Sequence, residues 1–287
     1  MKPNVIMRAY NDMPLISETL TSLKRQNIAF ELIALDNESD DGTREELDKY
    51  ADKVINIPKG TYVPGKVLNQ AMRESQGEFV VFLNSDCTPQ NEFWLKNLLA
   101  GFDGDDKIAA VFGRQIPRKN CGKLFAKDTE DTFGSGERQK FWKHCFSMAA
   151  SAIRRSVWDE MNFNENIQYS EDIEWTWQAR QKGYKIKYVP DSIVAHSHNY
   201  SLKQFYKRHY GEGKAEADIF EWQPWEQSVV RYSLLPFARQ VISDWKFSIL
   251  KLDLISMIHS PLLRGSQMLG RRKGFKEQIQ INKEKQK

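Results

Sequence analysis

The amino-terminal part of the chain alternates between short apolar segments and segments whose apolar residues recur at helical spacing. Strands are predicted over residues 4–9, Phe30–Leu35, Val54–Ile57 and Glu78–Leu83. Helices are predicted between them, over Pro14–Gln26, within residues 39–51 and over Lys66–Ser75. Neighbouring parallel strands need a long crossover, which is usually a helix. The alternation therefore predicts an α/β fold, with a mostly parallel central sheet flanked by helices.

Polar side chains stand where three of the predicted strands end. These ends carry Arg8-Ala9-Tyr10-Asn11, Asp36-Asn37 and Asn84-Ser85-Asp86. In open parallel sheets, ligands bind beyond the carboxyl ends of the strands. We therefore expect these three segments to surround a ligand site.

Two carboxylates at these ends suit different parts of a ligand. Asp36 can accept a hydrogen bond from a nucleobase N–H or a ribose hydroxyl, or it caps the helix that follows. Asp86 is placed to hold a hard divalent cation, which prefers oxygen ligands and shares them with phosphates. An isolated Ser-Asp pair is equally typical of an ordinary turn, so neither role rests on position alone.

Two later segments also carry chemistry. Ser170-Glu171-Asp172 opens a predicted helix, where serine is a good cap and acids suit the positive helix end. With Glu174, three acids in four residues exceed what capping needs, which leaves at least one for chemistry. His196 and His198 lie two residues apart on a predicted strand and point to the same face. Either or both can bind a metal, although a single histidine is more often structural.

Composition excludes several classes of protein. A formal net charge of +4, from 42 basic and 38 acidic residues, is too small to indicate nucleic-acid binding. Cys87, Cys121 and Cys145 form neither a zinc motif nor a disulfide framework, which favours a reducing cytoplasm. The first residues become polar too early for a signal peptide, and no run of about 18 uncharged apolar residues predicts a membrane span.

The segment after residue 120 is less regular. Residues 120–140 are polar and charged and predict a mobile loop. A short helix is predicted over Arg154–Met161, and the chain is helical from Leu202 onward, ending in a basic stretch.

Taken together, six motifs resemble glycosyltransferase family 2 over roughly residues 3–215. They are Tyr10-Asn11, Asp36 through Thr43, Gly65-Lys66-Val67-Leu68-Asn69, Gly77 through Asp86, Glu171-Asp172 with Trp175 and Gly183-Tyr184, and Pro190 through His196. Each motif is weak alone, but six in the right order and spacing are specific. Asn84 replaces the first aspartate of the usual Asp-x-Asp, and this Asn with the His196-Ser197-His198 ending resembles rhamnosyltransferase-like members.

The resemblance implies a GT-A fold, with a catalytic domain over residues 1–215 and a helical C-terminal extension with a basic tail over residues 216–287. It implies an enzyme that moves a hexosyl or deoxyhexosyl group from a nucleoside-diphosphate sugar to an acceptor hydroxyl, with inversion. The acceptor would be a glycan or a lipid-linked glycan in the synthesis of cell-surface polysaccharide.

The resemblance also implies roles for individual residues. Asp86 and His196 would hold Mn²⁺ or Mg²⁺. Asp172 would be the general base, with Glu171 as its main competitor because neighbouring helix residues point in different directions. Lys66 would assist at the phosphates or remain a solvated helix charge. The residues expected to contact the donor nucleotide are Ala9, Tyr10, Asn11, Asp36, Lys66, Asn84 and Ser85.

Two other classes of function remain to be weighed. A nucleotidyltransferase also uses an α/β domain with metal-binding carboxylates, but it would need a glycine-rich basic loop after the first strand, which is not present. A non-catalytic carbohydrate-binding protein would not need Asp36, Asp86, Asp172 and His196 together.

The C-terminal region suggests a membrane surface. Phe247–Leu263 is apolar but interrupted by charges, so it would lie flat on a bilayer. Arg264, Arg271, Arg272, Lys273 and Lys276 follow and would favour anionic lipids. The alternative is a helix pair packed on the catalytic domain. We therefore expect a cytoplasmic protein with a peripheral contact at the inner face of the cell membrane.

Overall fold

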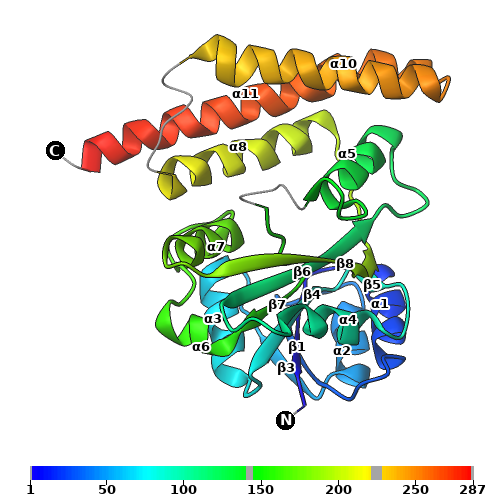
Figure 1. The fold of residues 1–287 in the computed structure, drawn as a ribbon, viewed down its shortest axis with the longest axis vertical. Helices are drawn as coiled ribbons and strands as arrows, with labels where there is room; N and C mark the ends of the chain where they lie inside the picture. The colour runs from blue at the N-terminus through cyan, green and yellow to red at the C-terminus, as the bar shows by residue number, and fades with distance from the viewer. Residues whose placement is uncertain (1, 140–144, 221–227, 286–287) are drawn as a thin grey trace. The chain divides into compact units, whose positions relative to one another are not determined.

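The computed structural model describes residues 2–139, 145–220 and 228–285. The chain forms two compact units (Figure 1). The first comprises residues 1–120, 126–167 and 171–197, and the second comprises residues 121–125, 168–170 and 198–287. The boundary expected at residue 215 falls inside helix α8 (Leu202–Ile219), and the division into two functional domains stays a prediction.

A single eight-stranded sheet organises the first unit. Its strands are β1 (Asn4–Ala9), β2 (Glu31–Asp36), β3 (Lys53–Asn56), β4 (Phe79–Asn84), β5 (Thr88–Pro89), β6 (Ile108–Ile116), β7 (Ala150–Arg154) and β8 (Lys185–Ala195). They lie in the order β3-β2-β1-β4-β7-β6-β8-β5. Strands β1 to β4 are parallel, and β6 is parallel to β8, whereas β7 and β5 run antiparallel to their neighbours. The mostly parallel sheet predicted from the alternation is confirmed.

Helices cover both faces of this sheet. They are α1 (Leu15–Lys24), α2 (Thr43–Tyr50), α3 (Pro64–Glu74), α4 (Trp94–Leu99) with the 3₁₀ turn η1 (Ala100–Phe102), α6 (Arg155–Glu160) and α7 (Glu171–Gln181). Side chains of α1, α2 and α4 pack in one apolar core, and those of α3, α6 and α7 pack in the other. The two groups lie to the right and to the left of the sheet in Figure 1.

Helix α5 (Lys123–Phe133) corrects one expectation, because it occupies a segment predicted to be a mobile loop. The polar sequence was misleading. Lys127 pairs with Asp131 one helical turn later, at 3.0 Å, and Leu124 is buried in an apolar cluster with Phe205 and Leu263.

Asn69 joins α3 to the segment that follows α6. Its side chain is 2% exposed. The amide nitrogen donates to Phe163 O and Glu165 Oε1, both at 2.9 Å. The amide oxygen accepts from Trp158 Nε1 at 2.9 Å and from Phe163 N at 3.0 Å. The asparagine of the Gly-Lys-x-x-Asn motif is therefore a structural residue that fixes α3, the helix that also carries Val67 two residues earlier, beside the predicted ligand site.

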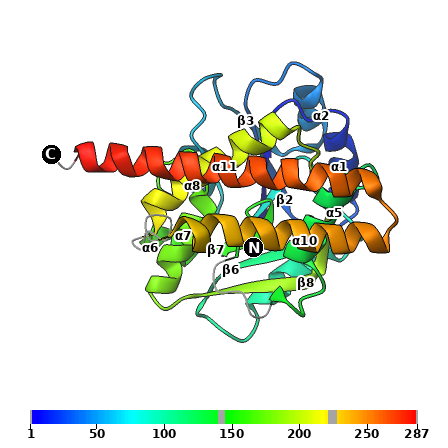
Figure 2. The ribbon, with the colours of Figure 1, turned by 90° about the horizontal axis from the view of Figure 1, so that it is seen from above.

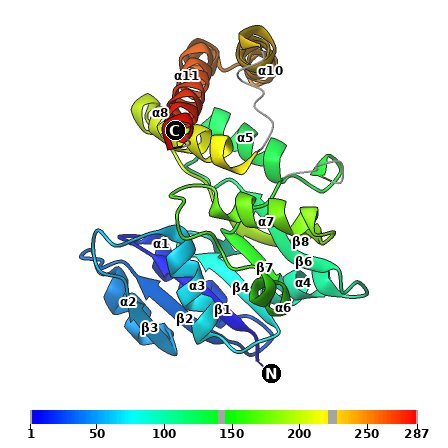
Figure 3. The same ribbon diagram turned by 90° about the vertical axis from the view of Figure 1, so that its left-hand side faces the viewer.

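Three helices and a short π-helical turn form most of the second unit. They are α8, η3 (Val230–Leu234), α10 (Leu235–Leu250) and α11 (Leu254–Lys285). Helices α8 and α11 approach each other closely, as the end-on view in Figure 3 shows. A Cβ added to Gly213 would lie 2.1 Å from Arg271 O, and one added to Gly274 would lie 2.0 Å from Tyr210 O. No larger residue fits at either position without separating the two helices.

Helices α10 and α11 form an antiparallel hairpin (Figure 2). A buried ion pair holds them together, with Asp244 Oδ2 at 2.7 Å from Arg264 Nε and Oδ1 at 3.0 Å from Nη2. Ser260 Oγ donates to the same carboxylate at 2.7 Å. Among the described residues, no helix has a stretch long and apolar enough to cross a membrane.

Substituting Asn69 tests its structural role. Asn69→Ala should lower the free energy of unfolding by about 2–4 kcal/mol, because it leaves buried groups of Phe163 and Trp158 without partners. Chemical denaturation followed by circular dichroism measures the loss. Arg73→Ala, an exposed position on the same helix, is the control and should change little. A stability equal to that of the control would contradict the structural role.

Candidate active site

A cavity of about 350 Å³ opens where β1, β2 and β4 end. It is lined by Arg8, Ala9, Tyr10, Asp12, Leu35, Asn37, Ile57, Tyr62, Val67, Asn84, Ser85 and Asp86. The register places Ala9 beside Asp36 and Arg8 beside Asn84. The three strand ends that the sequence singles out therefore meet at one edge of the sheet, as parallel pairing requires.

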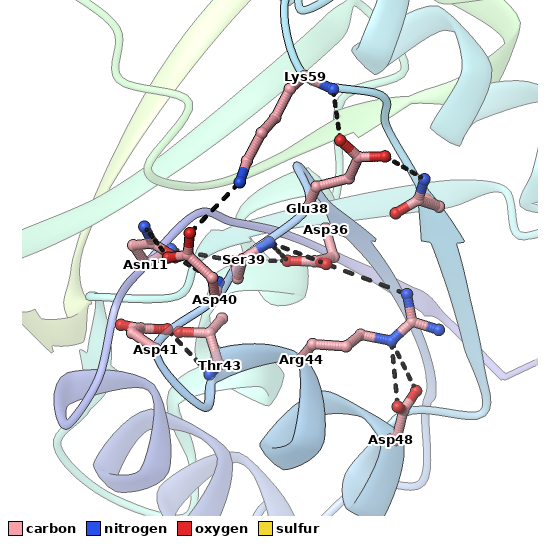
Figure 4. A network of polar contacts seen from close by, with 11 residues as sticks. Asn11, Asp36, Glu38, Ser39, Asp40, Asp41, Thr43, Arg44, Asp48 and Lys59 are labelled. Carbon is pink, nitrogen blue, oxygen red and sulfur yellow. Dashed lines mark hydrogen bonds and ion pairs between the residues drawn. The ribbon is translucent and has the colours of Figure 1, made fainter.

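Asp36 and Asn37 have different surroundings, and Figure 4 shows the polar contacts around Asp36. The Asp36 carboxylate is 2% exposed and accepts from Ser39 Oγ at 2.6 Å and from Ser39 N at 3.3 Å. Asn37 lines the cavity, and its buried Oδ1 has no hydrogen-bond partner within the described part of the chain. Asn37 therefore lines the cavity with an unsatisfied, buried amide oxygen, whereas the Asp36 carboxylate is engaged by the loop that follows β2.

Asn11 braces two loops at this edge of the sheet. Its amide nitrogen donates to Asp40 Oδ1 at 3.0 Å, and its amide oxygen accepts from Asp40 N at 2.9 Å. Its own N–H donates to Ser39 Oγ at 3.0 Å. The loops after β1 and β2 are thus tied together, and the preceding Tyr10, half exposed, lines the cavity.

Asp12 and Ser85 connect the loops after β1 and β4. The Ser85 hydroxyl donates to Asp12 Oδ2, which also accepts from Tyr10 N at 2.9 Å. Burial raises the pKa of the Asp12 carboxyl, although these hydrogen bonds oppose the shift. Ser85 is only 2% exposed, so its main contact is this internal one. Lys66 is exposed on α3, next to Val67, which lines the cavity.

Asp86 and His196 face each other at the end of β4 and just after β8. His196 Nε2 lies 3.4 Å from Asp86 Oδ2, and both side chains are largely buried. Gln115 Nε2 donates to Ser147 Oγ at 3.0 Å, so Gln115 Oε1 accepts from His196 Nδ1 at 2.7 Å. A neutral imidazole with Nδ1 protonated presents the Nε2 lone pair to a carboxylate. Two facing acceptors suit either a proton on the ring or a cation between them.

Cys87 is the third member of this cluster, whose ligand atoms all lie within 4.8 Å of one another. Its side chain is fully buried, and burial raises the pKa of the thiol well above its usual range, with Asp86 adding to the shift. A protonated thiol is a poor ligand for a hard cation. The donor set therefore fits a hard divalent cation through Asp86 and His196 alone. His198 packs against Tyr200, with ring centroids 5.4 Å apart.

Arg8 connects the strand ends to the acid pair. Its Nη2 donates to Asn84 Oδ1 at 3.0 Å, and its Nη1 lies 3.3 Å from Glu171 Oε1. Glu171 is the first residue of α7 and is 8% exposed. Burial and the neighbouring Asp172 raise the pKa of Glu171 to about 6, against the opposing effect of Arg8.

Asp172 faces a different neighbour. Its Oδ2 accepts from Met148 N at 3.1 Å, and its Oδ1 accepts from Ile173 N at 2.8 Å. Burial raises the pKa of Asp172 above its ordinary value, although these N–H groups lower it. Glu171 thus pairs with the Arg8 guanidinium, whereas the described hydrogen bonds to the Asp172 carboxylate come from backbone N–H groups. Asp172 is the more exposed of the two residues.

Sequence reasoning places Arg8 and Asn37 at strand ends without giving them a role, and it does not single out Asp12 or Gln115. Arg8, Asn37 and Asp12 line the cavity, and Gln115 orients His196. The positions of Arg8 and Asn37 directly at strand ends are a signal for two of them. Asp12 and Gln115 carry no local signal. The arrangement combines a cavity of about 350 Å³, a side-chain pair whose chemistry fits a cation, and a separate carboxylate pair, which suits group transfer from a phosphorylated donor.

Comparisons with known proteins agree with this arrangement. The O-antigen chain rhamnosyltransferase WbaN of Salmonella anatum is 31% identical over 219 residues, which cover 71% of this chain and 67% of WbaN. The O-antigen chain rhamnosyltransferase RfbN of Salmonella typhimurium is 29% identical over 246 residues, covering 79% of this chain and 75% of RfbN.

A solved structure shares the fold. The mannosyltransferase PcManGT of Pyrobaculum calidifontis, in complex with GDP-mannose and Mn²⁺, superposes with a TM-score of 0.67 at 16% identity, over 96% of this chain and 88% of that one. The sequence profile of Glycosyl transferase family 2 matches residues 4–161. With that match and a relative above 30% identity, the chain belongs to glycosyltransferase family 2.

Proposed function

We propose that this glycosyltransferase moves a hexose or deoxyhexose from a nucleoside-diphosphate sugar to an acceptor hydroxyl, with inversion, during synthesis of a cell-surface polysaccharide. The observation that carries the proposal is the double contact of Arg8. It links Asn84, beside the cation-binding pair, to Glu171, beside the expected base. Arg8, which lines the cavity, thereby connects the part that would hold a donor to the part that would activate an acceptor. The two Salmonella relatives favour a deoxyhexose donor.

The nucleobase of the donor is assigned to the end of the cavity at Asn37. The amide of Asn37 offers both an acceptor and a donor, which matches the adjacent N–H and carbonyl groups of a uracil, thymine or guanine edge. Asp36 supports this end indirectly, since it orients Ser39, which receives the N–H of Asn11. Tyr10 and the apolar Leu35, Ile57 and Val67 supply walls for a planar ring.

The diphosphate is assigned to the end near Asp86, His196 and Arg8. A divalent cation, Mn²⁺ or Mg²⁺, bound by Asp86 and His196 would supply positive charge for the departing nucleoside diphosphate. The Arg8 guanidinium adds a fixed positive charge at the cavity wall, and its contact with Asn84 sets its direction. Lys66 is exposed near the same opening and is an additional candidate for the phosphates.

The acceptor proton is assigned to Asp172. An attacking hydroxyl must lose its proton, and a carboxylate with a raised pKa is a stronger base while it stays ionised. Glu171 is the competitor: burial raises its pKa as well, but its Oε1 lies 3.3 Å from Arg8 Nη1, and the charge of that guanidinium opposes proton uptake. A single base and direct displacement give inversion at the anomeric carbon. We further propose that the acceptor is a lipid-linked glycan, met at the inner face of the cell membrane through the C-terminal region.

The general reaction has a direct test. Purified protein is incubated with UDP-, dTDP- and GDP-sugars and Mn²⁺, and release of the nucleoside diphosphate is measured. A nucleotidyltransferase would release a nucleoside monophosphate or pyrophosphate instead, and a carbohydrate-binding protein would release nothing.

The cation proposal predicts metal-linked binding of the nucleotide. Calorimetry of nucleoside diphosphate with Mn²⁺ and with chelator should differ by about tenfold or more in Kd for the unaltered protein. Asp86→Asn and His196→Ala should abolish this difference, because each removes one ligand. Cys87→Ser is the control and should keep it. Equal affinity of the unaltered protein in metal and in chelator would refute the cation site.

The assignment of the nucleobase to Asn37 predicts a change in nucleotide preference. Asn37→Ala should weaken the preferred nucleoside diphosphate by roughly tenfold, the scale of one or two hydrogen bonds, and reduce the differences among UDP, dTDP and GDP. Asp36→Asn should instead weaken all three nucleotides similarly and lower thermal stability, because it disturbs the loop. If Asp36→Asn alone removes the preference, Asp36 and not Asn37 contacts the base.

The general-base proposal predicts a separation of kcat from donor binding. Asp172→Asn should lower kcat by about a hundredfold or more while the donor Kd stays nearly unchanged. Glu171→Gln should be milder, because the amide can still contact Arg8.

The same proposal fixes the direction of the pH dependence. The base must be deprotonated, and burial raises the pKa of Asp172. Transfer should therefore decline as the pH falls, beginning above the ordinary aspartate pKa of about 3.9. Near-normal turnover of Asp172→Asn, or loss of donor binding along with turnover, would show that another group is the base.

A further inference from the structure

The turn between α10 and α11 exposes an unusual set of aliphatic side chains. We define the hairpin tip as residues 249–258. Within it, Leu252 is 91% exposed, Leu250 is 83% exposed and Ile255 is 81% exposed. Ile249, Leu254 and Ile258 are also more than half exposed. Large aliphatic side chains gathered at one place on a surface usually mark an interaction site.

The tip is held firmly by its own contacts. Asp253 directly precedes α11, and it accepts from Ser256 N at 3.2 Å and from Ser256 Oγ at 2.6 Å. Lys123 Nζ lies 3.1 Å from the same carboxylate. Together these groups hold the pKa of Asp253 at about 2. The aliphatic side chains therefore project from a defined turn.

Leu252 is the most informative residue of the tip. Its φ is +51°, a left-handed conformation that favours glycine or asparagine over leucine. Neither the turn geometry nor burial within the described residues calls for an aliphatic side chain at this position. An aliphatic side chain at this position is explained if Leu252 is buried in a partner outside this chain.

The exposed charged side chains of residues 235–263 all carry the same sign. Residues 235–263, all described, contain only two acids, and both are turned inward. Asp244 is 0% exposed and paired with Arg264, and Asp253 is 8% exposed. Arg239, Lys246 and Lys251 are exposed. An apolar tip with exposed cations beside it and no exposed acid complements an anionic lipid surface.

We propose that the α10–α11 hairpin tip inserts into the surface of an anionic bilayer, with Leu250, Leu252, Leu254 and Ile255 among the head groups and acyl chains. The tip is a surface anchor and does not span the membrane. The anchor extends the peripheral membrane contact proposed above. It rests on the proposed function only for the location of the acceptor, because lipid binding is measured without sugar transfer.

The structure favours a bilayer over two other arrangements. If a second copy of the chain covered the tip symmetrically, the exposed cations of both copies would be brought together, with no exposed acid of residues 235–263 to oppose them. A contact through the basic tail alone also fits less well. Arg264 is buried against Asp244, and Arg271 pairs with Glu216, so neither is free for lipid.

Co-sedimentation with vesicles tests the proposal on the full chain. The unaltered protein should bind phosphatidylglycerol–phosphatidylcholine vesicles at low salt, bind phosphatidylcholine alone more weakly, and be released by added salt. Leu252→Gln with Ile255→Gln should lower the partition coefficient by about tenfold or more, because two aliphatic groups no longer enter the bilayer. Leu269→Gln, another exposed leucine of α11, is the matched control and should bind normally.

A second pair of variants separates the tip from the tail. Lys246→Gln with Lys251→Gln should reduce the preference for anionic vesicles, whereas Lys276→Gln should not. Thermal unfolding should be unchanged in all variants, since these side chains are exposed. The proposal is overturned if the tip variants bind vesicles as the unaltered protein does, if Lys276→Gln alone abolishes binding, or if ultracentrifugation reveals a dimer that the tip variants dissociate.

Glycosyl transfer distinguishes this inference from the proposed function. With a short soluble acceptor, the tip variants should retain normal kcat, while Asp172→Asn should not. Normal vesicle binding without any transfer would refute the proposed function and leave the anchor intact.

Discussion

The parallel pairing of β1 with β2 and β4 is the constraint on which the rest of the site depends. The register aligns Ala9 with Asp36 and Arg8 with Asn84, so three loops leave the sheet at the same edge. Hydrogen bonds from Asn11 to Asp40 and from Ser85 to Asp12 then tie these loops together. A cavity with polar walls follows, because the strands bring backbone ends and their side chains to one place while the apolar cores lie behind them.

The charges of the site are divided between two carboxylate centres. At one, Asp86 faces His196, whose orientation is set by Gln115. At the other, Glu171 and Asp172 open α7, and only Glu171 contacts Arg8. Under the proposed function, the first centre needs positive charge to receive a diphosphate, whereas the second needs it to limit the cost of two adjacent buried acids. Arg8 offsets the charge of the two acids from a position that also lines the cavity. A strand-end arginine is therefore compatible with a site for an anionic donor.

In the second unit, a charged pair is buried and aliphatic side chains are exposed, whereas an ordinary helical hairpin buries its aliphatic side chains and exposes its charges. Asp244 and Arg264 are buried between α10 and α11, whereas leucine and isoleucine side chains are exposed at their turn. Burying a charge pair is costly unless both partners are well matched, and here three hydrogen bonds meet the Asp244 carboxylate. The pairing removes an acid from the surface and holds the two helices in register. The remaining acid of residues 235–263, Asp253, is 8% exposed and paired with Lys123, so the apolar end carries no exposed acid of that segment.

Much of the fold follows from local sequence patterns. The alternation of strands and helices, the first strand at residues 4–9 and the helical C-terminal region are all read from periodicity, because a strand or helix repeats its apolar positions over a few residues. The same patterns failed at α5, where pairing along the helix and burial of Leu124 outweigh a polar composition.

For the candidate site too, some features follow from the sequence and others only from the tertiary structure. Sequence determined which residues stand at strand ends and helix starts, and it placed Asp36, Asp86, Asp172 and His196 among the candidates. Tertiary structure decided that Asn37 lines the cavity while Asp36 supports its loop, that Glu171 rather than Asp172 pairs with Arg8, and that Asn69 is structural. Two partners of Arg8, Asn84 and Glu171, lie 76 and 163 residues away in the chain. No local pattern encodes such contacts, because the direction of a side chain at a loop or helix end is fixed by the distant segments that pack against it.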